Sequence, residues 1–189
     1  MTELPKARVA TASLAGCFGC HMALLDIDER LIELMKKVEF SRSPLTDIKS
    51  FDKRCDIGII EGGCCNEENV HVLQDFRRNC DVLIAIGQCA IMGGLPAMRN
   101  AIMHSDEPLR ECLEEAFITG RYMRNTTHNI PNDPALPLLL DEVYACTEVV
   151  EIDYNIPGCA PSGDVIFEML DRLLAGRFRG FERERIRFD

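Results

Sequence analysis

The amino-acid sequence predicts an α/β protein with a flavodoxin-like, doubly wound three-layer sandwich around a mainly parallel sheet. Two observations lead to this prediction. Short runs of continuous apolar residues alternate with longer amphipathic stretches, and no internal repeat or interdomain linker interrupts them. Strands buried on both faces of a parallel sheet have this continuous apolar character and are separated by helices. Residues 1–189 are therefore expected to form a single domain with its own core.

The N-terminal half is expected to contribute two strands and two helices. Residues 7–14 (ARVATASL) form an apolar run typical of a buried strand, and residues 21–38 repeat apolar side chains every three or four positions, as one face of a helix does. Residues 56–63 (DIGIIEGG) predict a second strand that runs into a glycine turn. Asn66 is expected to cap a helix that continues to about residue 79.

The second half is expected to add two strands and two helices. Residues 81–87 (DVLIAIG) give the clearest strand, and a glycine-rich turn and a short helix over about 96–103 follow it. Residues 147–154 (TEVVEIDY) predict the last strand. Residues 164–175 predict the last helix, which Gly176 ends.

Two segments fit this alternation less well. Residues 104–146 are irregular and rich in proline, and they are interpreted either as a surface excursion that ends in a short helix around 136–146 or as a partner-facing loop. The tail over 176–189 carries five arginines among three phenylalanines. It is typical of a solvated end, with docking against another subunit as the alternative.

Composition excludes several classes of function. The formal net charge is -10, which repels phosphate backbones and argues against a nucleic-acid partner. No apolar run reaches the roughly 18 residues of a membrane span, and the N-terminus has no apolar segment typical of an export signal. A cytoplasmic protein is expected.

Cysteine is the most informative residue type. Ten cysteines in a chain of this length, with no export signal, favour metal or cluster ligation over a disulfide scaffold. Three separated turns at expected strand ends carry four of them, and each turn is flanked by glycine or proline: AGCFGC, GQCAIMGG and PGCAPSG. Because ligands bind outside the carboxyl ends of parallel strands, these thiols are expected to meet at one edge of the sheet. They are Cys17, Cys20, Cys89 and Cys159.

Four thiolates suit either tetrahedral zinc or a [4Fe–4S] cluster. Structural zinc usually uses two paired CxxC motifs, whereas here one pair joins two single cysteines, so the pattern favours the cluster and leaves zinc open. Cys64 and Cys65 follow residues 56–63 at the same edge and are reserve ligand candidates. The remaining cysteines are interpreted as core or surface thiols. They are Cys55, Cys80, Cys112 and Cys146.

Two polar residues accompany the cysteines. Glu61 ends its strand at the ligand edge, where a carboxylate could relay protons, bind a partner, cap the next helix or lie on the surface. His21 beside Cys20 is interpreted either as a hydrogen-bonding neighbour of the cluster or, more simply, as a solvated side chain. The chain has no nucleotide-binding glycine loop and no tryptophan, which disfavours a flavin. One cluster without an acid–base dyad indicates electron transfer.

With these motifs, in this order and together with EGG at 61–63, residues 8–175 resemble the small subunit of nickel–iron hydrogenases. The cluster-bearing 20 kDa-type subunit of respiratory complex I is similar, but in that family the first motif looks like two adjacent cysteines. The spaced pair in CFGC therefore favours the hydrogenase subunits. Periplasmic small subunits have a C-terminal domain with two further clusters, whereas this sequence ends soon after its last expected helix, so a single cluster is expected. It looks most like the small subunits of cytosolic NAD-reducing, bidirectional enzymes. Phe18 departs from the small hydroxyl residue of many relatives, which puts a proton role there in doubt.

The resemblance implies one proximal [4Fe–4S] cluster on Cys17, Cys20, Cys89 and Cys159. It implies electron transfer between a nickel–iron site in a separate large subunit and diaphorase subunits that carry further clusters and FMN, for the reaction H2 + NAD+ to NADH + H+. No catalytic residue is expected in this chain itself. Two alternatives remain: an equivalent subunit of a complex-I-like or other-acceptor hydrogenase complex, and a zinc-stabilised flavodoxin-like binding module.

Overall fold

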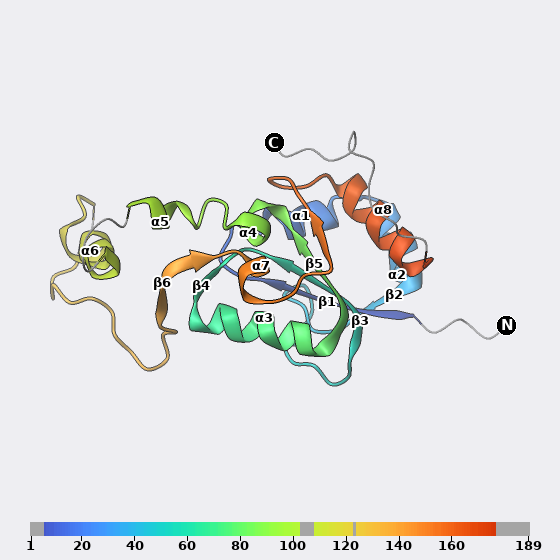
Figure 1. Ribbon diagram of the computed structural model, residues 1–189, viewed down its shortest axis with the longest axis horizontal. Coiled ribbons are helices and arrows are strands. Elements are labelled where there is room, and N and C mark those ends of the chain that lie inside the picture. The colour runs from blue at the N-terminus through green and yellow to red at the C-terminus, as the bar shows by residue number, and fades with distance from the viewer. Residues whose placement is uncertain (1–5, 103–107, 123, 177–189) are drawn as a thin grey trace.

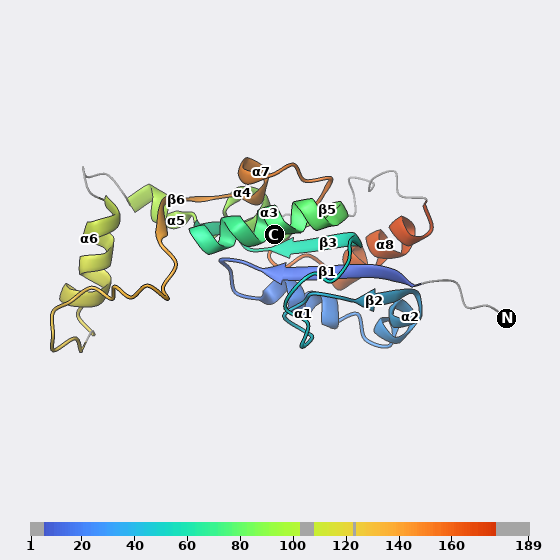
Figure 2. The ribbon, with the colours of Figure 1, turned by 90° about the horizontal axis from the view of Figure 1, so that it is seen from below.

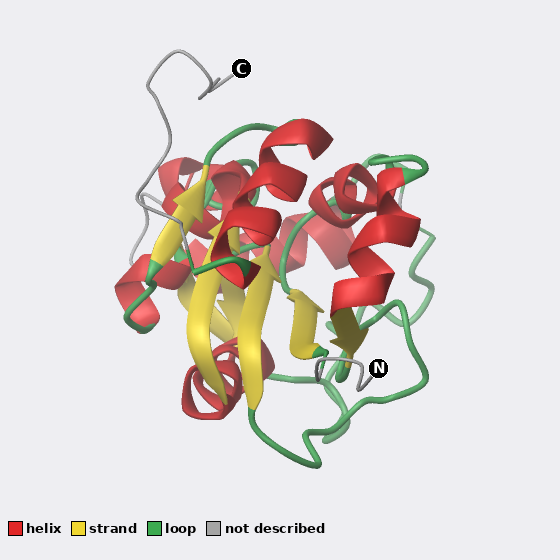
Figure 3. Cartoon of the chain, turned by 90° about the vertical axis from the view of Figure 1, so that its right-hand side faces the viewer, coloured by secondary structure: helices red, strands yellow, loops and turns green. Residues whose placement is uncertain are grey.

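Five parallel strands form the centre of the computed structural model, which describes residues 6–102, 108–122 and 124–176. Their order across the sheet is β2-β1-β3-β5-β7, with every neighbouring pair parallel. This is the doubly wound arrangement that the sequence predicts, so the expected fold class is confirmed (Figure 3). The strands are β1 (Ala7–Ser13), β2 (Val38–Phe40), β3 (Cys55–Glu61), β5 (Cys80–Ile86) and β7 (Tyr154–Ile156).

The register aligns the carboxyl ends of four strands. Ser13 of β1 pairs with Glu61 of β3, Glu61 pairs with Ile86 of β5, and Ile86 pairs with Ile156 of β7. The loops that leave these four strands therefore start from one line at one edge of the sheet. Any side chains that they carry are brought together by strand pairing alone.

Helices cover both faces of the sheet (Figure 2). On one face α1 (Gly19–Leu25), α2 (Arg30–Lys37) and α8 (Gly163–Leu174) pack over the alternate strand residues that include Ile59 and Ile84. On the other face α3 (Glu67–Asn79), α4 (Gly87–Met92) and α7 (Cys146–Val149) pack over residues that include Ile60 and Leu83. Side chains alternate between the faces of a strand, so two apolar cores form from the same continuous runs.

A second, smaller sheet lies beside the edge formed by the carboxyl ends of these strands. It consists of β4 (Cys64–Asn66) and β6 (Leu139–Tyr144), which pair antiparallel. Between α5 (Met98–Ile102) and β6 the chain forms α6 (Pro108–Glu114), the π-helix η1 (Glu115–Thr119) and a long loop. The described residues over 108–138, here called the arm, project away from the main sheet (Figures 1 and 2).

The structure corrects two expected elements near the C-terminal half. Residues 147–154 are not one strand: α7 comes first, and only residues 154–156 join the sheet as β7. Val149 and Val150 pack on the core instead, so burial overrides their strand propensity. The short helix expected around 136–146 is wrong as well, because β6 forms there by pairing with β4.

The first expected helix is divided. Residues 21–38 contain α1, a turn in which Asp28 has a φ of 54°, and α2, and Val38 already begins β2. The turn at 87–95 contains the helix α4, which the sequence pattern does not indicate. The cap of α3 is confirmed, since the Asn66 side chain accepts the backbone N–H of Asn69 at 2.8 Å. The arginine-rich tail lies outside the described residues beyond Gly176.

The α3-side core is expected to depend on Phe76, which is 0% exposed and packs edge to face with Phe51. Phe76→Ala should lower the free energy of unfolding by about 3–5 kcal/mol, because it removes buried surface and leaves a cavity. Tyr122→Ala is the matched control, since Tyr122 is 92% exposed in the arm and should change stability by less than about 0.5 kcal/mol. Chemical denaturation of both variants measures the difference, and equal values would contradict the packing described.

Candidate metal centre

Backbone contacts join neighbouring loops at this edge of the sheet in pairs. Cys17 lies in the loop after β1, Cys20 in the first turn of α1, Cys89 in α4 and Cys159 in the loop after β7. The loops after β1 and β3 are joined by two hydrogen bonds between the backbones of Ala15 and Gly63, at 2.8 and 2.9 Å.

The loop after β7 is tied to α4 in the same way. The Gln88 N–H donates to the Gly158 carbonyl at 3.1 Å, one residue before each of Cys89 and Cys159. The mutual electrostatics agree with this arrangement. Burial is the main cause that raises the pKa of Cys89, and the neighbouring thiols of Cys159 and Cys17 raise it further.

Cys20 occupies the inner part of the group. Burial raises the pKa of its thiol strongly, and the charge of Glu61 is the next cause. The thiols of Cys17 and Cys89 add to the effect. Each of the four predicted cysteines therefore raises the thiol pKa of another, or has its own raised, at this edge of the sheet.

Glycines let the sulfurs lie directly against backbone. A Cβ built on Gly87, whose φ is +81°, would lie 2.3 Å from the Cys20 sulfur. A Cβ on Gly94 would lie 2.8 Å from the sulfur of Cys89. These are the close approaches that only glycine allows, and hydrogen bonds from such backbone to cluster sulfur tune iron–sulfur centres.

The donor set fits an iron–sulfur cluster. Cys17 and Cys159 are exposed while Cys20 and Cys89 are half-buried, so the thiols span the boundary between core and surface. Among the described residues, no three His, Cys, Asp or Glu side chains converge closely enough to hold one metal ion. A [4Fe–4S] cluster does not require that convergence, because each thiolate binds a different iron.

Glu61 and His21 form a buried pair beneath this edge, which the sequence pattern alone does not reveal. Glu61 is 2% exposed and His21 is 0% exposed, so the expectations of a surface charge at Glu61 and of a solvated His21 are wrong. The next helix, α3, is capped by Asn66 and not by Glu61. The Nδ1 of His21 lies 2.8 Å from Oε1 of Glu61. The other oxygen, Oε2, accepts the backbone N–H groups of Cys20 at 2.9 Å and of His21 at 3.2 Å.

The Glu61 carboxylate is stabilised by these donors. Burial by itself would raise the pKa of Glu61, but the neighbouring His21 and Ser13 outweigh burial and the net pKa is lowered. The signal in the sequence was position: Glu61 is the last residue of the strand and follows the buried apolar residues Ile59 and Ile60. Its burial depends on the returning α1 turn, which spacing alone does not reveal.

The reserve candidates lie elsewhere in their turn. Cys64 is fully buried beside Cys146, whose thiol donates to the Gly62 carbonyl at 3.2 Å. The thiol of Cys65 contacts Oδ1 of Asn69 at 3.3 Å. Both thiols therefore have contacts within the β4 region of the fold, distinct from those that join the four edge cysteines.

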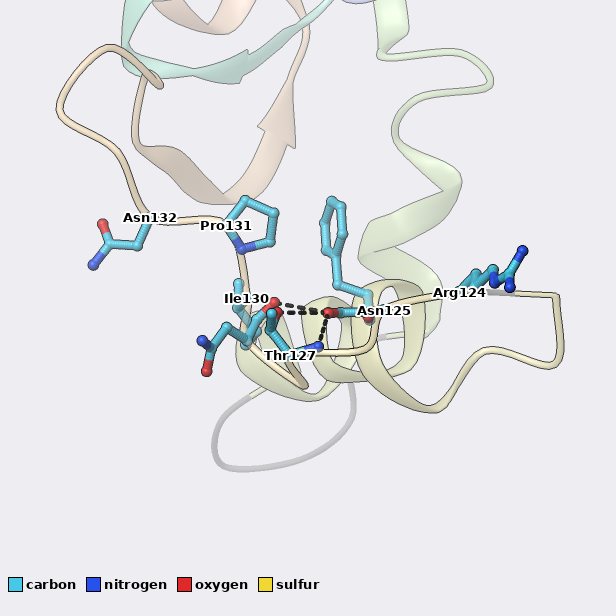
Figure 4. Close-up of a pocket in the computed structure, with 8 residues that line it drawn as sticks. Arg124, Asn125, Thr127, Ile130, Pro131 and Asn132 are labelled. Atoms are coloured by element: carbon cyan, nitrogen blue, oxygen red, sulfur yellow. Dashed lines mark hydrogen bonds between the residues drawn. The ribbon is translucent and has the colours of Figure 1, made fainter.

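The remaining cysteines agree with the interpretation as packing residues. Cys55 and Cys80 are buried partners at the amino ends of β3 and β5, and Cys112 is half-buried in α6. A cavity of about 680 Å³ lies in the arm, away from the cysteine edge. Its wall is organised by Asn125, which accepts from the N–H and hydroxyl of Thr127 (Figure 4). No cysteine is among its lining residues.

Comparison with known proteins points to one family. A family model described as NADH ubiquinone oxidoreductase, 20 Kd subunit, matches residues 17–173. The NAD-reducing hydrogenase HoxS subunit delta of Cupriavidus necator is 48% identical over 91% of this chain and 80% of its own. A subunit of the F420-non-reducing hydrogenase vhu of Methanococcus voltae is 34% identical over 91% of this chain, and the match spans 58% of that relative's length.

Solved structures agree. A chain in the crystal structure of an NAD+-reducing [NiFe]-hydrogenase in the H2-reduced state superposes with a TM-score of 0.90 at 49% identity, covering 98% of this chain and 100% of that one. A chain of the [NiFeSe] hydrogenase from Desulfovibrio vulgaris Hildenborough has a TM-score of 0.56 at 17% identity over 90% of this chain and 60% of that one. The second likeness shows the shared fold alone.

Gly87→Ala is expected to prevent most iron binding, because the added Cβ would occupy the place of the Cys20 sulfur. Gly176→Ala is the matched control: its φ is also positive, at +65°, but no atom lies within 4 Å of the added group. Both variants bear the backbone strain of a left-handed residue. Iron bound per chain, after anaerobic loading with iron and sulfide, should fall in the first variant and stay near the native value in the second. Equal iron in both would contradict the packing of Cys20 against Gly87.

Proposed function

The chain belongs to the family of the 20 kDa subunit of NADH ubiquinone oxidoreductase, and we propose that within it the protein is the electron-transfer small subunit of an NAD-reducing nickel–iron hydrogenase. The observation that carries this proposal is the match to a chain of an NAD+-reducing [NiFe]-hydrogenase along essentially the whole length of both chains. The 48% identity to a subunit of a second NAD-reducing hydrogenase supports it. The overall reaction of the complex would be H2 + NAD+ to NADH + H+.

The ligand edge would hold one [4Fe–4S] cluster through Cys17, Cys20, Cys89 and Cys159. Such a cluster supplies one-electron transfer when bound. The chain itself binds and orients it. The aligned strand ends fix the thiols, glycines such as Gly87 admit sulfur against backbone, and the buried pair beneath the edge supports the turn that carries Cys20.

A partner is expected to cover this edge, because an exposed cluster is open to solvent and oxidants. Exposed large apolar side chains lie on α1, which carries Cys20, and on the segment after Cys89, where Leu95 is 72% exposed. Apolar anchors with a high exposed area are typical of the core of a subunit interface. Besides Leu95 they are Met22, Met92 and Met98.

We assign this surface to a large subunit that holds the nickel–iron site. Further clusters and FMN would belong to diaphorase subunits, with no flavin in this chain, and the arm within residues 104–146 would be a partner-facing part of a single domain. The NAD-linked reaction suggests the cytoplasm. Among the described residues, no helix is long and apolar enough to cross a membrane.

A second candidate function is the same electron relay in a hydrogenase with another acceptor. It is favoured by the resemblance to subunits named for F420-non-reducing hydrogenases at 34% identity. The four ligands and the large-subunit surface would serve equally in that case. The NAD-reducing assignment rests on the higher identity and on the TM-score of 0.90.

Cys89→Ser is expected to abolish hydrogen-dependent NAD reduction by the purified complex, because one ligand of the relay is lost. Cys112→Ser is the matched control, since Cys112 is a half-buried thiol of α6 in the arm and should leave the rate within about twofold of native. NADH formation under hydrogen, followed by absorbance, measures both. Full activity of Cys89→Ser would overturn the ligand assignment.

Leu95→Asp is expected to reduce recovery of the large subunit severalfold when the complex is isolated through a tag on this chain. The substitution places a charge in an apolar patch that association would bury. Ile32→Asp provides the control, because Ile32 is 64% exposed on α2, outside that patch. Equal recovery with both variants would show that the large subunit binds another face.

A further inference from the structure

We propose that Glu61 is a positioning residue that holds the CxxC turn in place and lowers the reduction potential of the cluster bound there. The inference rests on the proposed function and extends it to a residue that ligates no metal. It starts from an unusual neighbour: the buried carboxylate of Glu61 directly follows the buried apolar residues Ile59 and Ile60 at the end of β3.

The Glu61 carboxylate is attached to the ligand turn through the backbone. Its Oε2 accepts two consecutive N–H groups, those of Cys20 at 2.9 Å and His21 at 3.2 Å. Cys20 and Glu61 are 41 positions apart, so the contact ties α1 to the end of β3 across the edge of the sheet. Moving the carboxylate would move the peptide unit that carries a ligand.

His21 fixes the second carboxylate oxygen. Its Nδ1 lies 2.8 Å from Oε1 of Glu61, and its ring stacks on Phe18 with the centroids 4.7 Å apart and the planes 9° from parallel. Phe18 itself has a left-handed backbone, with a φ of 67°, which turns its side chain over the histidine. In the CFGCH stretch, Cys17 and Cys20 would ligate the cluster, while Phe18 and His21 hold the Glu61 carboxylate in place.

The charge of Glu61 acts on the cluster through a short, dry path. Glu61 is 2% exposed and hydrogen-bonded to the residue that supplies a thiolate, so little water screens its negative charge. Reduction adds one more negative charge to the cluster. A fixed anion at this position disfavours that step and lowers the potential, which net charge and hydrogen bonding are known to set in iron–sulfur centres.

Glu61→Gln separates charge from shape. The amide keeps the length of the side chain, and its oxygen can still accept the two N–H groups, while the negative charge is removed. The full chain would be loaded anaerobically with iron and sulfide, and the midpoint potential of its cluster followed by EPR at one fixed pH. We expect the potential to rise, with a shift of about tenfold in the equilibrium for reduction, equivalent to ~59 mV for one electron.

Glu39→Gln is the charge-matched control. Glu39 is an exposed residue of β2, at the far strand of the sheet order, and its loss should leave the potential at the native value. An unchanged potential in Glu61→Gln with an intact cluster would overturn the proposal. An equal shift in Glu39→Gln would overturn it as well, since a general change in net charge would then explain the result.

Glu61→Asp keeps the proposal testable if the glutamine variant binds no iron. The shorter side chain withdraws the charge from the Cys20 N–H, so a smaller rise in potential is expected. A native potential in this variant, or loss of the cluster in both variants, would mean a purely structural role and would overturn the proposal. The native chain separates failure of this proposal from failure of the proposed function. If the native chain forms no iron–sulfur cluster, the proposed function is wrong. If it forms the cluster but the potential does not change in the Glu61 variants, only the role of the carboxylate is wrong.

Discussion

Alignment of four parallel strand ends is the constraint on which the rest of the structure depends. Ser13, Glu61, Ile86 and Ile156 lie in one register line, so every loop that leaves β1, β3, β5 or β7 starts at the same edge. A parallel sheet places such loops together whatever their separation in sequence. Cysteines from three of these loops meet for this reason, and the end of β3 supplies the carboxylate beneath them.

Close backbone packing then turns a meeting of loops into a defined site. Two Ala15–Gly63 hydrogen bonds join the loops after β1 and β3, and the Gln88–Gly158 hydrogen bond joins α4 to the loop after β7. The buried Glu61 adds a polar contact from the sheet to the ligand turn. A buried carboxylate is costly without polar partners, and here two backbone N–H groups bond one oxygen while Nδ1 of His21 lies 2.8 Å from the other.

Much of this was accessible from sequence, and the exceptions have physical causes. Continuous apolar runs revealed β1, β3 and β5, and the position of cysteines after such runs predicted that they lie at one edge of the sheet. The prediction of a strand over residues 147–154 was wrong because valines that pack against a sheet look the same in sequence as valines within a strand. Residues 136–146 form β6 only because β4 is available as a partner, a long-range pairing that local periodicity cannot show. The burial of His21 and Glu61 likewise depends on the α1 turn returning over β3.

Metal analysis combined with EPR of the hydrogen-reduced complex, purified anaerobically through a tag on this chain, tests the central claim most directly. We predict about four irons for this chain's site and the signal of a reduced [4Fe–4S] cluster, with nickel present only when a large subunit is bound. A colourless chain that contains zinc and shows no iron–sulfur signal would contradict the account. Its four thiols would then stabilise a fold rather than carry electrons.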